Sequence, residues 1–201
     1  PNVLAGGIAI NEILIDPNSA TLNFDTDGNG TADDRDEFIE IHNLSGATID
    51  IGNFKLWDPG NGVWFTFPAG TMLGAGNFAV VVCGVQTGGS LPPVTGGNLA
   101  FNAARTSSII NNSGDNVVLH DPNLNQFIQL VFNGNAPVDP TPTFPGATLV
   151  GSIENWGSDT DGTSRVRYPA GDSNIVNHNT ISPDLASPGS GGVFLAVSLQ
   201  S

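Results

Sequence analysis

Short apolar runs separated by turn residues recur along the whole chain. The runs mix β-branched and aromatic residues with polar ones, as half-buried strands do, and the breaks are rich in Gly, Pro, Asn and Asp. Many short strands at close spacing predict an antiparallel sandwich or barrel. We expect strands in IAINEILID (8–16), EFIEIHN (37–43), FKLWD (54–58), VWFTF (63–67), NFAVVVCG (77–84), NVVLHD (116–121), QFIQLVF (126–132) and TSRVRY (163–168).

Helical periodicity is missing from the same pattern. The best helical candidate, LAFNAAR at 99–105, is long enough for only a turn or two. The segments 86–98 and 133–147 are rich in Gly and Pro and are therefore expected to be long loops. Because no shift in composition divides the chain, we expect one domain over residues 1–190. Residues 191–201 are expected to form a linker or an extra C-terminal strand.

The composition and net charge of the chain indicate which classes of binding partner are excluded. Hydrophobic residues make up 39% of the 201 residues, and the formal net charge is −14, from 19 acids against 5 bases. Nucleic acids and anionic membranes are bound mainly through Lys and Arg. We therefore expect neither a nucleic-acid partner nor binding to an anionic membrane surface, and a cation is the natural complement. Because the sequence has no run of about 18 apolar residues, we also expect no membrane insertion. The lone cysteine, Cys83, lies in an apolar run and is expected to be buried.

The negative charge is concentrated in DTDGNGTADDRDEF, residues 25–38, whose spacing matches the calcium-loop pattern D-x-[DN]-x-[DN]-G-x5-E. So many acids in a short span repel one another unless a cation neutralises them. An oxygen-only ligand set without His or Cys selects calcium or magnesium over zinc. The sequence thus predicts a calcium site. Its ligand positions fall on Asp25, Asp27, Asn29, Thr31 (through its carbonyl oxygen), Asp33 and Asp36, with Gly30 at the sharp turn.

The residue that closes this site has two candidates, Asp36 and Glu37. Adjacent residues at the start of a strand point to opposite faces, so at most one of them is a full ligand. Spacing favours Asp36, whereas reach and the bidentate habit of glutamate favour Glu37. The flanking segments TLNF (21–24) and FIEIHN (38–43) are strand-like rather than helical. A structural calcium ion is therefore expected, without the opening of a helix pair that calcium sensors show.

The order of these segments resembles the lamin tail domain in its bacterial secreted form. The most specific part is EFIEIHNLSG…IDIGNFKLWD with FPAGTMLGAGNFAVVV, and the likeness extends from about Ile8 to Gly189. The resemblance implies an all-β, immunoglobulin-like antiparallel β-sandwich with long loops, and an extracellular or cell-surface location. Bacterial members of that family often accompany secreted nucleases, phosphatases or adhesive repeats as accessory modules. Some carry an acidic insertion between their first two strands, and the family supplies no catalytic residues.

Two functions follow as hypotheses. The first is a non-catalytic, calcium-binding module that binds or displays another protein or a cell-surface component, or assists a neighbouring domain. The alternative is a metal-dependent extracellular hydrolase, nuclease- or phosphatase-like, that uses the calcium site. A hydrolase needs a second cluster of convergent His, Asp and Lys, but His42, His120 and His178 lie far apart and beside no nucleophile motif. Glu12 and Glu40 lie in neighbouring predicted strands, where one alternative is that they pair as carboxylates. The favoured expectation is that each faces solvent or caps the calcium loop.

Overall fold

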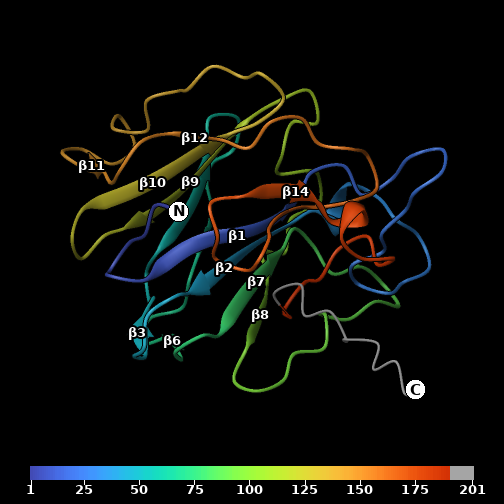
Figure 1. Cartoon of the computed structure of the whole chain (residues 1–201), viewed down its shortest axis with the longest axis horizontal. Helices are drawn as coiled ribbons and strands as arrows, with labels where there is room; N and C mark the ends of the chain where they lie inside the picture. The colour runs from blue at the N-terminus through green and yellow to red at the C-terminus, as the bar shows by residue number, and fades with distance from the viewer. Residues whose placement is uncertain (191–201) are drawn as a thin grey trace, which may run out of the picture.

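The structure is a computed structural model of the chain, and it describes residues 1–190 (Figure 1). All eight expected strands are present, together with short additional ones and the single-turn 3-10 helices η1 (Asp34–Asp36) and η2 (His178–Thr180). The possible C-terminal strand at 191–201 lies outside the described residues. The strands are β1 (Ile8–Leu14), β2 (Phe38–Asn43), β3 (Ile49–Asp50), β4 (Lys55–Asp58), β5 (Gly62–Thr66), β6 (Met72–Leu73), β7 (Phe78–Val82), β8 (Leu99–Asn102), β9 (Asn116–Asp121), β10 (Gln126–Val131), β11 (Thr148–Leu149), β12 (Glu154–Asn155), β13 (Arg165–Arg167) and β14 (Ile175–Asn177).

Two large sheets contain most of these strands. The first has the order β14-β13-β1-β2-β7-β8, and the second has the order β11-β10-β9-β4-β5, with β12 also paired to β10. β3 and β6 form a small separate sheet. Most neighbours are antiparallel, but β8 runs parallel to β7, and β11 and β12 run parallel to β10. The described part of the chain contains no helix with the length and apolar character needed to cross a membrane.

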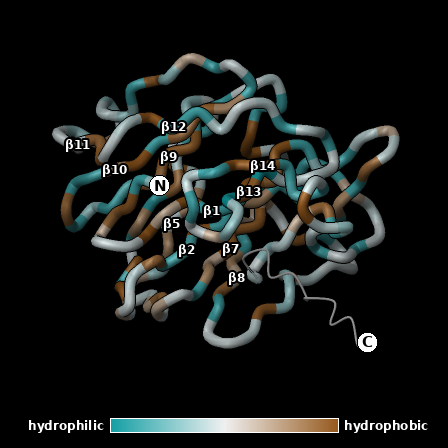
Figure 2. Tube along the Cα trace, viewed as in Figure 1, coloured by the Kyte–Doolittle hydropathy of each residue, from teal (hydrophilic) through white to brown (hydrophobic). Residues whose placement is uncertain are grey.

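The main hydrophobic core lies between the two sheets. Ile39 and Val81 of the first sheet and Leu56 and Leu119 of the second are fully buried in one cluster, which Cys83 joins as predicted. Figure 2 shows hydrophobic positions recurring along the strands. Burial of this apolar surface against the opposite sheet stabilises the sandwich. The expected immunoglobulin-like β-sandwich is thereby confirmed.

The outer faces of both sheets are covered as well, which explains why the central strands are buried at every position. On the first sheet, Phe38 and Val82 pack against Leu91 and Ala186. On the second, Trp57 and Phe127 pack against Phe144 and Ala147. The long loops 86–98 and 133–147 therefore serve as covers for the outer faces.

The structure differs from the local sequence pattern in two places. LAFNAAR does not form a helix, because Leu99–Asn102 adds the parallel edge strand β8 beside β7. TLNF is not a strand either, since in that region only Asn23 forms an isolated bridge, to Asn18. In the first case the hydrogen bonds available at the sheet edge outweigh the weak helical preference of the segment.

Glu12 and Glu40 are also placed differently from expectation, because both are fully buried rather than solvent-facing. They oppose each other in the β1–β2 register, beyond an irregularity in the pairing at Ile10. Glu12 accepts hydrogen bonds from the Ser187 amide at 2.8 Å and the Ser164 hydroxyl at 2.6 Å. Glu40 accepts one from the Gly189 amide at 2.6 Å. The two carboxylates thus hold the C-terminal segment against the outer face of the first sheet.

Burial of Glu40 beside Glu12 should make the free energy of unfolding depend on pH. Burial raises the pKa of Glu40 well above its ordinary value of 4.5, and the charge of Glu12 raises it further. The folded state therefore binds a proton more tightly than the unfolded chain. The stabilisation is complete below pH 4.5 and decreases as pH rises toward the folded pKa.

The Glu40→Gln variant is expected to show a shallower decrease in unfolding free energy between about pH 5 and pH 8 than the wild-type chain. Urea unfolding at a series of pH values measures this slope. Asp50→Asn, a change of the same charge at an exposed position, should leave the slope unchanged. Equal slopes for Glu40→Gln and the wild type would contradict the assignment of this pH dependence to Glu40.

Candidate metal centre

The acidic loop lies between β1 and β2 and ends in the 3-10 turn η1. Carboxylate oxygens of Asp25, Asp27 and Asp36 lie within 4.8 Å of one another. Asp27 and Asp36 are buried and Asp25 is half-buried. Gly30 has a φ of +97°, the left-handed conformation that the pattern requires at its sharp turn. The structure thus brings together three of the predicted ligands, at the first, third and twelfth positions of the pattern.

Backbone amides orient the carboxylate of Asp25. Its Oδ1 accepts a hydrogen bond from the Gly28 amide at 2.8 Å, and its Oδ2 accepts one from the Gly30 amide at 2.6 Å. Asp27 Oδ1 likewise accepts from the Asn29 amide at 3.0 Å. Asp25 Oδ1 also accepts from the Asn29 amide at 3.2 Å, whereas Asp25 Oδ2 and Asp27 Oδ1 each accept one of these bonds and keep a second lone pair.

Asp36 is held from both ends of the loop. Its Oδ1 accepts hydrogen bonds from the amides of Thr26 and Asp27 at 2.7 and 3.1 Å, and its Oδ2 accepts from the Asp33 amide at 2.9 Å. Burial raises the pKa of Asp36 to about 6, these backbone bonds oppose the rise, and the nearby charge of Asp27 adds to it. A cation among these oxygens would favour the ionised form of all three carboxylates.

The other pattern residues have different partners. Asn29 Oδ1 accepts a hydrogen bond from the amide of Thr31 at 2.7 Å, and the Thr31 residue itself is exposed. Asp33 pairs with Arg35 at 2.9 Å, and this side-chain bond lowers the pKa of Asp33. The only base of the loop is therefore engaged outside the three-carboxylate group.

Glu37 lies outside this group and serves another segment. Its Oε2 accepts hydrogen bonds from the amides of Ile109 and Ile110 at 2.6 and 3.0 Å. Burial raises the pKa of Glu37 to about 9, and these two bonds oppose the rise. Of the two candidates for the closing position, the structure turns Asp36 toward Asp25 and Asp27, and Glu37 toward the strand-free segment before β9.

Loop 86–98 contributes contacts that the sequence pattern did not predict. The Gln86 amide donates to Asp27 Oδ2 at 2.6 Å, and the Ser90 amide donates to the Asp27 carbonyl at 2.7 Å. A Cβ added at Gly89 would lie 2.4 Å from Asp27 Cγ, so only glycine fits beside this carboxylate. The Gly-Gly pair at 88–89 was the one local signal of a close backbone approach.

The histidines do not join the carboxylate group. His42 stacks on Phe78 with a ring-centroid separation of 4.0 Å, and His120 stacks on Phe144 at 4.1 Å. The ring of His178 contacts the Asp184 carbonyl at 2.8 Å. Each of the three therefore occupies a separate packed environment in the described part of the chain.

Comparison with known proteins identifies the family. A family model described as Lamin Tail Domain matches residues 4–138, about two thirds of the chain. No curated protein matches the chain. The match covers β1 to β10 with the acidic loop, and thus strands of both large sheets. The chain belongs to the lamin tail domain family.

Proposed function

We propose that this chain is a calcium-binding, non-catalytic immunoglobulin-like module that works outside the cell or at its surface. The observation that carries the proposal is the convergence of Asp25, Asp27 and Asp36, whose carboxylate oxygens lie within 4.8 Å of one another. Like charges this close repel, and among the described residues none of the three forms an ion pair. A bound cation removes that repulsion.

Calcium suits the ligand atoms that this site offers. The side-chain ligand atoms are all oxygens. Calcium accepts six to eight oxygen ligands in flexible geometry, whereas magnesium requires a near-ideal octahedron. The curled loop can add a carbonyl oxygen and water to its three carboxylates. The loop joins strands of a packed sheet rather than a pair of helices, so the ion would stabilise the β1–β2 connection and the loop at 86–90 that contacts it.

The rest of the molecule fits a binding or accessory role better than a catalytic one. The family is an immunoglobulin-like one that is not generally catalytic, and the histidines lie apart from the carboxylates. A net charge of −14 and a calcium loop both suit the calcium-rich extracellular environment. The partner that we propose is another protein or a cell-surface component, and no observation favours the hydrolase hypothesis.

Isothermal titration calorimetry with calcium tests this proposal. The wild-type chain should bind one calcium ion at the loop, and Asp25→Asn should weaken that binding at least about tenfold, equivalent to about 1.4 kcal/mol. The control is Asp50→Asn, because Asp50 also accepts a bond from an amide two residues onward, Gly52 at 2.8 Å, but lies outside the loop. Unchanged binding by Asp25→Asn, or loss of binding in both variants, would refute the assignment.

A further inference from the structure

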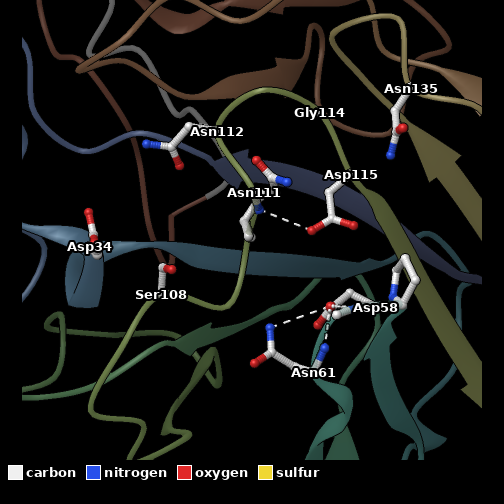
Figure 3. A pocket seen from close by; sticks show the side chains of 12 residues that line it. Asp34, Asp58, Asn61, Ser108, Asn111, Asn112, Gly114, Asp115 and Asn135 are labelled. Carbon is white, nitrogen blue, oxygen red and sulfur yellow. Dashed lines mark hydrogen bonds between the residues drawn. The ribbon is translucent and has the colours of Figure 1, made fainter.

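A second group of carboxylates lines a pocket of about 520 Å³ at one end of the sandwich. Asp34, Asp58 and Asp115 lie around it, with the amide side chains of Asn61 and Asn111 between them (Figure 3). The lining contains no Lys, Arg or His. The pocket is distinct from the calcium loop, because Asp25, Asp27 and Asp36 are absent from its lining.

The pairing of β4 with β9 brings two of these acids to the same place. The antiparallel register places Leu56 opposite Leu119 and Trp57 opposite Val118. Asp58 ends β4, and Asp115 immediately precedes β9, so both lie at the same end of this strand pair. By the alternation of side chains, Asp58 lies on the same face as Leu56, which belongs to the main core. Its carboxylate is therefore directed toward the interior.

Asp58 carries a buried oxygen that the protein does not satisfy. The residue is 2% exposed, and its Oδ1 accepts hydrogen bonds from the amides of Gly60 and Asn61, both at 2.7 Å. Its Oδ2 is buried and has no hydrogen-bond partner among the described residues. A buried carboxylate oxygen without a donor is costly, and a ligand that supplies positive charge removes that cost.

Asp115 adds a second buried charge beside it. Its Oδ1 accepts from the Asn116 amide at 2.7 Å, and its Oδ2 accepts from the Asn111 amide at 3.0 Å. Burial raises the pKa of Asp58, and the charge of Asp115 raises it further. Arg105 donates to Asn61 Oδ1 of the lining at 3.0 Å rather than to either carboxylate. Both acids thus line the pocket, and neither forms an ion pair with any described residue.

We propose that this pocket is a second calcium site, in which Asp58 Oδ2 and a carboxylate oxygen of Asp115 bind the ion directly. Amide oxygens of the lining and water complete a shell of oxygen ligands, the donor set that calcium prefers. Two carboxylates are fewer than the three of the loop, so this site is the weaker one. Its Kd falls in the range of extracellular modules, about 10⁻⁴ to 10⁻³ M.

Amide NMR of the full chain resolves the two sites. Calcium chloride is added up to about 20 mM, well above the weakest Kd of this class. The amides of Gly60, Asn61 and Asn116, which donate to the pocket carboxylates, should shift and saturate. Asp58→Asn should abolish this response while the loop amides of Gly28 and Gly30 respond as in the wild type. Potassium chloride at matched ionic strength should give no saturable shift.

Asp121→Asn is the matched control. Asp121 also ends a strand, is 1% exposed and accepts bonds from the amides of Asn123 and Leu124, but lies outside the pocket. This variant should keep the pocket response. Pocket amides that do not respond in the wild-type chain, or that still saturate in Asp58→Asn, would overturn the proposal. The wild-type titration decides the question even if a variant fails to fold, and the loop amides report on the first site independently.

Discussion

Calcium is expected to raise the melting temperature of the chain, and a chelator is expected to lower it. A ligand that binds only the folded state stabilises it by RT ln(1 + [L]/Kd), about 2.7 kcal/mol at a hundredfold excess over Kd. For a chain of this size, each kcal/mol shifts the melting temperature by about 2–4 °C, so the expected shift is about 5–10 °C. The physical source is the relief of repulsion among Asp25, Asp27 and Asp36.

Differential scanning calorimetry with and without calcium measures this shift. Asp25→Ala or Asp27→Ala should remove most of it, because either change removes one of the three convergent carboxylates. Asp50→Asn should keep the full shift, since that residue ends β3 and lies outside the acidic loop. A melting curve that responds neither to millimolar calcium nor to chelator would reject the loop as a calcium site.

The sandwich was predictable from the sequence because its strands are apolar runs separated by strong turn signals. What the pattern could not show is which segments cover the outer faces. Leu91, Phe144 and Ala186 lie in stretches rich in Gly and Pro or in polar residues, yet they pack on the outer faces of the sheets. Such contacts join residues far apart in sequence, and local periodicity carries no information about them.

In the candidate site, too, local features were predictable and long-range contacts were not. The spacing of Asp25, Asp27 and Gly30 lies within one short segment, and the structure groups the two carboxylates and gives Gly30 the left-handed backbone that the pattern requires. The choice between Asp36 and Glu37 is not local, because Glu37 is drawn away by the amides of Ile109 and Ile110, more than 70 residues along the chain. The expectation that Glu12 and Glu40 face solvent failed for the same reason, since a C-terminal segment covers them.

The substitution Arg167→Ala, in the C-terminal part of the chain, should greatly lower the free energy of unfolding of the whole domain. Arg167 is 2% exposed, forms an ion pair with Glu154 and donates from Nε to the Ile10 carbonyl at 2.7 Å. Its guanidinium carbon also lies 5.1 Å from the centroid of the Trp156 ring. Arg167→Ala removes these contacts together and leaves the Glu154 charge without its partner. The expected loss of unfolding free energy is about 3–5 kcal/mol.

Urea unfolding followed by tryptophan fluorescence measures this loss. Lys55→Ala is the control for the loss of one positive charge, because Lys55 forms no ion pair with any described residue, and its effect should stay within about 0.5 kcal/mol. Arg167 lies beyond residue 138, where the family match ends, yet it bonds to β1 inside the match. If Arg167→Ala and Lys55→Ala lower the free energy of unfolding by the same amount, the segment from 139 to 190 does not contribute to the stability of the sandwich. A large loss in one cooperative transition makes it part of the domain, because unfolding the C-terminal part then also unfolds the sandwich.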